Sequence, residues 1–97
     1  MSAHHKKYKF SVTLHTEDPA VLHCLRSLCQ HCEKADYPQI GWGGTKQSTW
    51  RTQGGNFTLR FTNPQYRRIF LNEATRLLIG HWSLITQSDN DPATPRR

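Results

Sequence analysis

An alternation of apolar and polar residues begins at Tyr8 and predicts the first element of structure. The apolar positions are every second residue, namely Tyr8, Phe10, Val12 and Leu14. The polar residues between and after them are Lys9, Ser11, Thr13 and His15. A period of two in a run rich in β-branched and aromatic residues is typical of a strand with one buried face. We therefore predict a half-buried β-strand over residues 8–15.

Two later segments begin with a capping residue followed by proline. Asp18-Pro19 opens the first segment and Asn63-Pro64 opens the second. Asp or Asn can accept hydrogen bonds from the free backbone N–H groups of a helix start, and proline in the first turn loses none. The first segment carries an apolar stripe at spacings of three and four: Val21, Leu22, Leu25, Leu28, Cys29 and Cys32. We predict one helix that ends near residue 34 and another that ends before Gly80.

Residues 48–53 and 56–62 are shorter alternating runs, separated by two glycines. Glycines at this place indicate a β-hairpin, because they tolerate the positive φ angles of a tight turn. In that register Trp50 and Leu59 lie opposite each other on the core face. Residues 81–87 predict a final strand, since apolar residues alternate there as well.

The predicted order of elements is β-α-β-β-α-β. That order is the ferredoxin-like arrangement, an α+β fold with a four-stranded antiparallel sheet and two helices on one face. We expect a disordered basic arm at residues 1–7, a single domain at residues 8–87 and a disordered polar tail at residues 88–97. The first and third strands should lie in the middle of the sheet. The predicted core comprises Tyr8, Phe10, Val12, Leu14, Leu25, Leu59, Phe61, Phe70, Leu77 and Leu84.

Charge is distributed unevenly along the chain. The 97 residues include 13 Lys and Arg against 7 Asp and Glu, for a net charge of +6. No acidic residue lies between Tyr37 and Asn72. A positive field of this kind usually faces polyanions. The candidate binding residues are Lys9, Trp42, Lys46, Arg51, Arg60, Arg67 and Arg68.

The predicted fold suggests how these residues act. Lys9, Arg51 and Arg60 should contact phosphates from the helix-free face of the sheet, which is otherwise lined by threonines. The Gly-rich residues 41–48 are a candidate anion cradle next to Lys46. The aromatic residues of the third strand point to the core and the RNA-recognition signature is absent, so binding should rely on phosphates and be salt-sensitive. The alternative for this face is a solvated surface without a ligand.

Trp42 and the second helix could enlarge such a surface. An exposed Trp42 is a candidate stacking or interface residue, whereas a buried one simply packs on the core. Arg67 and Arg68 could extend the basic surface around the edge of the sheet. The alternative is that both arginines lie on an ordinary solvated helix face.

Three cysteines lie within nine residues of the first predicted helix, at Cys24, Cys29 and Cys32. Cys29 and Cys32 have the spacing of half a zinc site, but no second ligand pair follows. Because both fall on the buried stripe, we interpret them as core residues and expect no metal or cofactor. Their odd number argues against a disulfide framework. No apolar run approaches the roughly 20 residues of a membrane helix, so we expect a soluble, cytoplasmic protein.

The chain contains no recognisable catalytic motif, and we predict that it is not an enzyme. The leading hypothesis is a small basic domain that binds DNA or RNA. The alternative is a protein-interaction module, such as a regulatory subunit or inhibitor of a nucleic-acid-processing complex, that grips an acidic partner surface. A homodimer formed by edge-strand pairing is a further expectation.

Overall fold

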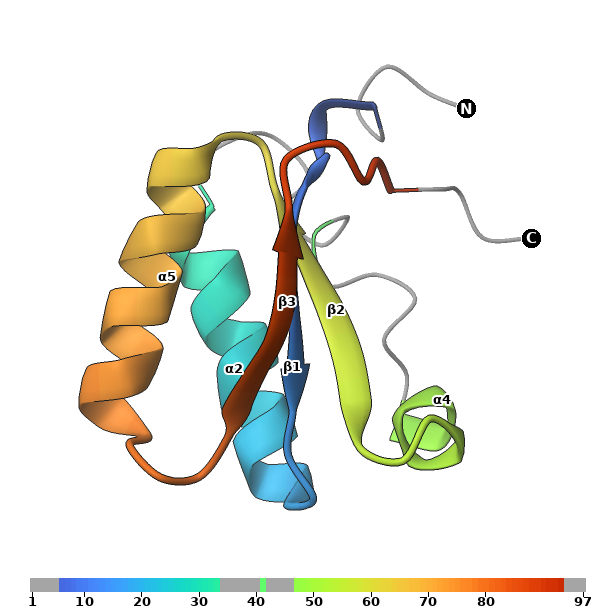
Figure 1. Ribbon diagram of the computed structural model, residues 1–97. Helices are drawn as coiled ribbons and strands as arrows, with labels where there is room; N and C mark the ends of the chain where they lie inside the picture. Colours follow the sequence, from blue (N-terminus) through green and yellow to red (C-terminus); the bar gives the residue numbers. More distant parts are fainter. Residues whose placement is uncertain (1–5, 34–40, 42–46, 94–97) are drawn as a thin grey trace.

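The computed structural model describes residues 6–33, 41 and 47–93 (Figure 1). Its elements are β1 (Phe10–His15), α2 (Pro19–Cys32), α4 (Gln47–Thr52), β2 (Asn56–Phe61), α5 (Pro64–Leu77) and β3 (Ser83–Ser88). The strands form an antiparallel sheet in the order β2-β1-β3, so β1 is central. Helices α2 and α5 cover one face of this sheet, and α4 lies beside the start of β2 (Figure 1). Within the described ranges, every helix is too short or too polar to cross a membrane.

Both long helices begin where the capping residues predict. The Asp18 carboxylate accepts a hydrogen bond from the backbone N–H of Ala20 at 2.9 Å. The Asn63 side chain accepts one from the N–H of Tyr66 at 2.9 Å. Each cap satisfies a backbone donor that the first helical turn leaves free. The predicted strand–helix units at residues 8–32 and 56–77 are therefore present.

The core lies between the sheet and the two long helices. Its fully buried side chains include Val12, Leu14, Leu22, Leu25, Leu59, Phe61 and Phe70. The rings of Phe61 on β2 and Phe70 on α5 pack with their centroids 5.3 Å apart. Two residues predicted for this core are exposed instead, Leu77 at 56% and Leu84 at 47%. Leu77 is the last residue of α5 and Leu84 lies on the edge strand β3, so neither is covered from all sides.

The predicted four-stranded, ferredoxin-like sheet is wrong. In the described part of the chain the sheet has three strands, and the segment predicted as its second strand forms the helix α4. Trp50 is the only large apolar residue of that segment, so the pattern held too little information to distinguish a strand from a helix. In α4 the Trp50 side chain is buried, and its indole N–H donates to the carbonyls of Thr16 at 2.9 Å and Gly55 at 3.0 Å. One consequence is that β2 is an edge strand rather than a central one.

The two glycines before β2 make a turn, although not the predicted hairpin. Gly54 and Gly55 have φ angles of 68° and 91°, which side chains with a Cβ rarely adopt. The Gly55 N–H donates to the carbonyl of Trp50 at 3.0 Å, so the turn ends α4 and leads directly into β2. The pattern thus predicted the backbone conformation correctly but assigned the wrong element in front of it.

Candidate functional site

The helix-free face of the sheet is lined by hydroxyl groups that already bond to each other. Thr13 on β1 lies opposite Thr58 on β2, and their hydroxyl oxygens are 2.9 Å apart. Next to them, Nδ1 of His15 and Oδ1 of Asn56 form a hydrogen bond of 2.9 Å. The predicted lining of polar residues is therefore present on these two strands. The Thr13 and Thr58 hydroxyls already form a hydrogen bond across the two strands, so a ligand would have to compete with this bond.

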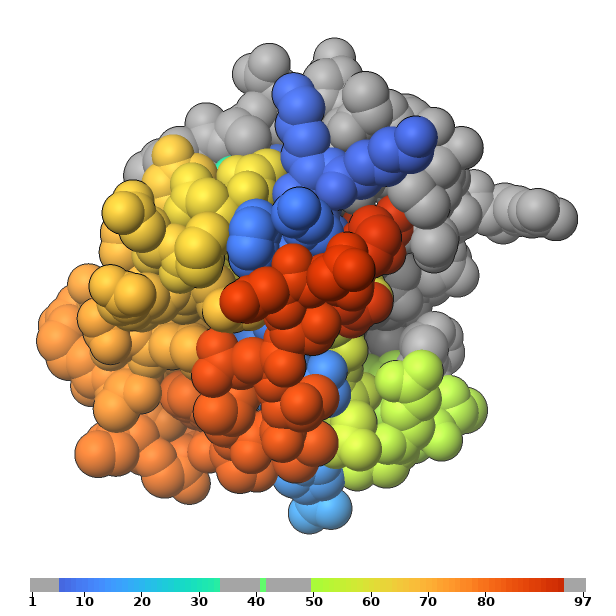
Figure 2. Space-filling model, turned by 45° about the horizontal axis from the view of Figure 1, so that its top comes forward, coloured from blue at the N-terminus to red at the C-terminus, as the bar shows by residue number. Residues whose placement is uncertain are grey.

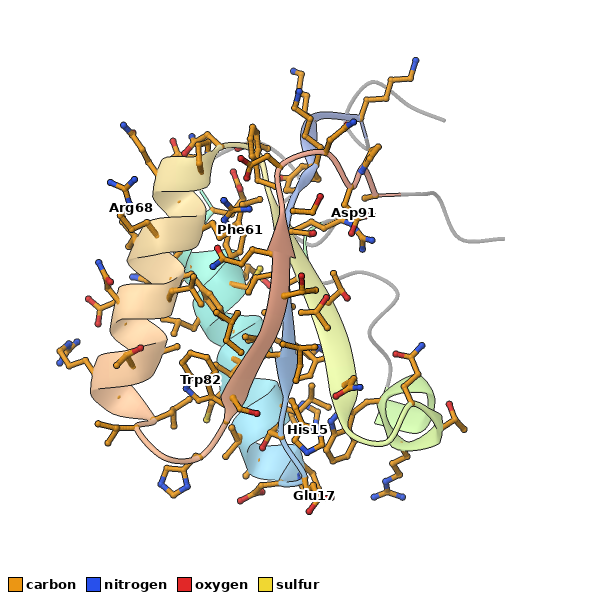
Figure 3. All side chains as sticks on the ribbon, in the orientation of Figure 1. His15, Glu17, Phe61, Arg68, Trp82 and Asp91 are labelled. Atoms are coloured by element: carbon orange, nitrogen blue, oxygen red, sulfur yellow. The ribbon has the colours of Figure 1, made fainter. Side chains whose placement is uncertain are left out.

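Arg60 occupies this face but is held by an acidic residue of the same chain. Its Nε donates to the backbone carbonyl of Asp91 at 2.8 Å, and its Nη2 lies 3.1 Å from the Asp91 carboxylate. Arg60 lies opposite Ser11 in the register, and the backbone N–H of Asp91 donates to the carbonyl of Lys9. The segment after β3 crosses the start of β1 (Figure 1) and brings Asp91 to the β2 side of the sheet (Figure 3). A phosphate would have to displace Asp91 to bind the same guanidinium.

Arg67 in the first turn of α5 is a second arginine held by internal partners. Its Nη1 donates to the carbonyls of Ser11 at 3.2 Å and Ser88 at 2.9 Å. Its Nη2 forms an ion pair of 2.7 Å with Asp89. Only 12% of the Arg67 side chain is exposed. These bonds connect α5 to β1 and β3, so the structure gives Arg67 a role in holding the sheet together.

Four other cations lie near the start of β1 and the start of α5. They are exposed and make no ion pair with any described residue. They are Lys6, Lys7, Lys9 and Arg68, which we call the basic end. Lys9 precedes β1, with its ammonium nitrogen 5.6 Å from the centroid of the Phe10 ring. Arg68 follows Arg67 on α5 and points away from the sheet (Figure 3). In Figure 2 the N-terminal residues (blue) stand out beside the start of α5 (yellow) and the segment after β3 (red).

The structure separates Arg51 from these cations. Arg51 was predicted on the sheet face with Lys9 and Arg60, but it is an exposed residue of α4. Its neighbour Trp50 bonds to Thr16, which follows the C-terminal end of β1, whereas Lys9 precedes the other end. A six-residue strand is roughly 20 Å long, so Arg51 and Lys9 lie at opposite ends of the domain. The predicted trio therefore does not form one surface.

Several predicted features lie outside the described residues. They are Trp42 and Lys46, the other residues of 42–46 in the Gly-rich stretch, residues 1–5 of the predicted arm and residues 94–97 of the predicted tail. The part of the tail that is described runs along the start of β1. There the N–H of Asp91 donates to the carbonyl of Lys9 at 2.8 Å, and that of Ala93 to the carbonyl of Tyr8 at 3.0 Å.

The cysteines lie where the helical stripe predicts. Cys29 and Cys32 are buried in the core, whereas Cys24 is exposed, and all three are free thiols. Burial raises the pKa of the Cys29 thiol far above its usual range, and the nearby Glu33 carboxylate adds to this rise. A thiol that keeps its proton is a poor nucleophile and a poor metal ligand. Within the described ranges, His, Cys, Asp and Glu side chains form no group that could hold a metal ion.

One exposed feature was not found from the sequence. Large apolar side chains emerge where α5 ends and β3 begins, with Ile79 exposed at 74%, Ile85 at 53% and Leu84 at 47%. A signal was present, because Leu84 and Ile85 are adjacent and strand geometry turns neighbouring side chains to opposite faces. Both residues could not be buried in one core.

Comparisons of the chain with protein-family models, with curated proteins and with solved structures found no match.

Proposed function

We propose that this domain binds the phosphate backbone of a nucleic acid through its basic end. The observation that carries the proposal is that some cations near the basic end have an acidic partner and others do not. Arg60 and Arg67 are neutralised by Asp91 and Asp89, whereas the lysines and Arg68 have no acidic partner among the described residues. The uncompensated charge belongs to a chain with a net charge of +6, which favours association with polyanions.

The proposed contacts are to phosphates rather than to bases. Base recognition in single strands commonly uses aromatic side chains on an open sheet as stacking platforms. The open-face positions of β1 and β2 are occupied here by Ser11, Thr13, His15, Asn56, Thr58 and Arg60. Phe57 and Phe61 are instead buried in the core. Binding should therefore tolerate any base sequence and weaken as salt rises, because each contacted phosphate releases counterions.

The proposal assigns different roles to the candidate residues. Lys9 and Arg68, together with Lys6 and Lys7, contact phosphates directly. Arg60 and Arg67 act as structural residues, because Asp91 and Asp89 largely neutralise their charges. In this proposal the protein binds its ligand without catalysing a reaction. Its three free thiols favour a reducing compartment such as the cytoplasm.

The test is fluorescence anisotropy with labelled random-sequence DNA and RNA oligomers at several salt concentrations. Arg68→Ala and Arg51→Ala are a matched pair, because each removes one exposed arginine from a helix. We expect Arg68→Ala to weaken binding to every oligomer and to reduce the log–log salt slope by roughly 1. Arg51→Ala should leave both quantities close to those of the parent.

Two results would contradict the proposal. One is equal weakening by the Arg68 and Arg51 variants, which would indicate a general effect of net charge. The other is a parent protein that binds no oligomer even at low salt. The second result would favour the alternative in which the basic end grips the acidic surface of another protein, for example in a nucleic-acid-processing complex.

A further inference from the structure

We propose that two copies of this chain associate through the exposed edge of β3. The two strands would pair antiparallel about a two-fold axis and continue the sheet from one copy into the other. This inference concerns the opposite edge of the sheet from β2 and does not depend on the function of the basic end.

The edge of β3 has the properties that favour pairing with another strand. β3 bonds to β1 on one side only, and its residues 83–87 are all exposed. An edge strand presents unpaired backbone N–H and C=O groups that can accept a further strand. Proteins usually protect such edges with charged residues or proline. The sequence of β3, Ser-Leu-Ile-Thr-Gln-Ser, contains neither, and its one irregularity is a register shift that leaves Ile85 without a partner residue in β1.

The other edge of the sheet is approached by the chain itself. Gly41 lies so close to β2 that a Cβ at this position would collide with the backbone carbonyl of Arg60. Such a close approach of two backbones is one of the reasons for glycine at a position. A strand joining β2 next to Arg60 would have to displace Gly41. In the described part of the chain, β3 is therefore the edge that remains open.

An apolar surface adjoins the edge of β3 and gives the pairing a hydrophobic component. Leu84 on the strand and Ile79 just before it are about half exposed or more. Between β3 and α5 lies a groove of about 400 Å³, whose apolar lining comprises Leu71, Ile79, Trp82 and Leu84. The Trp82 indole N–H donates to the carbonyl of Ala74 on α5 at 3.1 Å, which holds one wall of the groove in place (Figure 3). Exposed apolar surface of this kind marks interaction sites.

The groups at the two ends of β3 are complementary in an antiparallel pair, which favours a second copy as the occupant. Two molecules of charge +6 repel each other, and the uncharged β3 is where they can approach at the lowest cost. His81 precedes β3 and Asp89 follows it, so an antiparallel pair brings Asp89 of each copy toward His81 of the other. The same arrangement sends the two basic ends to opposite ends of the dimer. An isologous two-fold contact of this type is the commonest form of protein association.

The test is the mass of the protein in solution, measured by sedimentation equilibrium over a series of concentrations. We expect the parent to approach twice its monomer mass of 11.3 kDa. The variant Ile85→Lys places a charge on the edge and should stay at the monomer mass. The matched control is Ile69→Lys, because Ile69 is 48% exposed but lies on the side of α5 next to Leu28 and Cys32 of α2. The control should dimerise like the parent.

Circular dichroism will show whether Ile85→Lys folds, and Gln87→Lys replaces it on the same edge if it does not. A parent that remains monomeric at every concentration would overturn the proposal. A different protein would then be the candidate partner for the β3 edge. Dimers that persist in both edge variants would overturn it as well. Loss of the dimer in Ile69→Lys would show that association depends on net charge and not on β3.

Discussion

Arg60 on β2 forms an ion pair with Asp91, which lies in the segment that follows β3. The guanidinium makes two contacts with the same residue, one to its carboxylate at 3.1 Å and one to its backbone carbonyl at 2.8 Å. The pair therefore connects β2 directly to the segment that follows β3. Ser11 lies opposite Arg60 in the register and is only 3% exposed.

Removal of this carboxylate should weaken the domain modestly. We expect Asp91→Ala to lower the free energy of unfolding by about 1 kcal/mol, because the pair is partly exposed and its backbone hydrogen bond can remain. The control is Glu73→Ala, which removes the partner of the well-exposed Arg76 and should cost only about 0.3–0.5 kcal/mol. Urea denaturation measures both. Equal effects of the two variants would mean that the connection between β2 and the segment after β3 adds nothing to stability.

Truncation of Phe61 tests the register of the sheet. Phe61→Ala should cost about 3–5 kcal/mol, because its ring is fully buried against Phe70 and leaves a cavity. Leu77→Ala is the comparison, since Leu77 was predicted in the core but is 56% exposed. It should change stability by no more than about 0.5 kcal/mol. A large loss with Leu77→Ala would show that this end of α5 is covered in solution.

The two glycines after α4 should respond differently to substitution. Gly54→Ala forces a Cβ into the left-handed region, which costs roughly 1–2 kcal/mol, but the added atom meets open space. At Gly55 the same substitution places a Cβ 2.7 Å from the carbonyl oxygen of Thr16 and 2.9 Å from the His15 ring. Gly55→Ala should therefore be clearly the less stable variant in thermal unfolding. Equal melting temperatures would show that the backbone can shift away from Thr16.

The buried Cys29 thiol predicts a loss of stability in alkaline solution. Its pKa is raised in the folded state, so only the unfolded chain releases this proton once the pH exceeds the ordinary thiol pKa of roughly 8.5. Below that pH the contribution is fully present, and above it the free energy of unfolding falls by up to about 1.4 kcal/mol per pH unit. Denaturation between pH 8 and 10 should therefore show a shallower decline for Cys29→Ala than for the parent. Cys24→Ala, which removes an exposed thiol from the same helix, is the comparison variant.

Sequence patterns predicted elements wherever several residues repeated the same period. The strand predicted over residues 8–15 has four alternating apolar positions, and α2 and α5 each have a cap, a proline and an apolar stripe. Residues 47–52 have Trp50 alone, and one side chain defines no period. The predicted hairpin placed Trp50 on the core face, and Trp50 is buried, but it reaches the core from a helix and not from a strand.

The candidate site was harder to predict, because local sequence does not reveal which acid neutralises which base. Arg60 and Asp91 are 31 residues apart, and Arg67 and Asp89 are 22 apart. Both acids fall in the segment expected to be a disordered tail, so the arginines were expected to be free. The charge of Lys6, Lys7 and Lys9 could be predicted from the sequence, because these lysines are exposed and their charge does not depend on a tertiary contact.

The central position of β1 has a consequence for the speed of folding. Its partners lie far along the chain, since Thr13 bonds to Thr58 over 45 residues and Thr16 to His81 over 65 residues. The chain must close both long loops before these contacts offset the entropy that closure costs. Folding should accordingly take on the order of milliseconds to seconds, slower than in a small bundle of helices. Substitutions that only stabilise α2 locally should therefore change the folding rate very little.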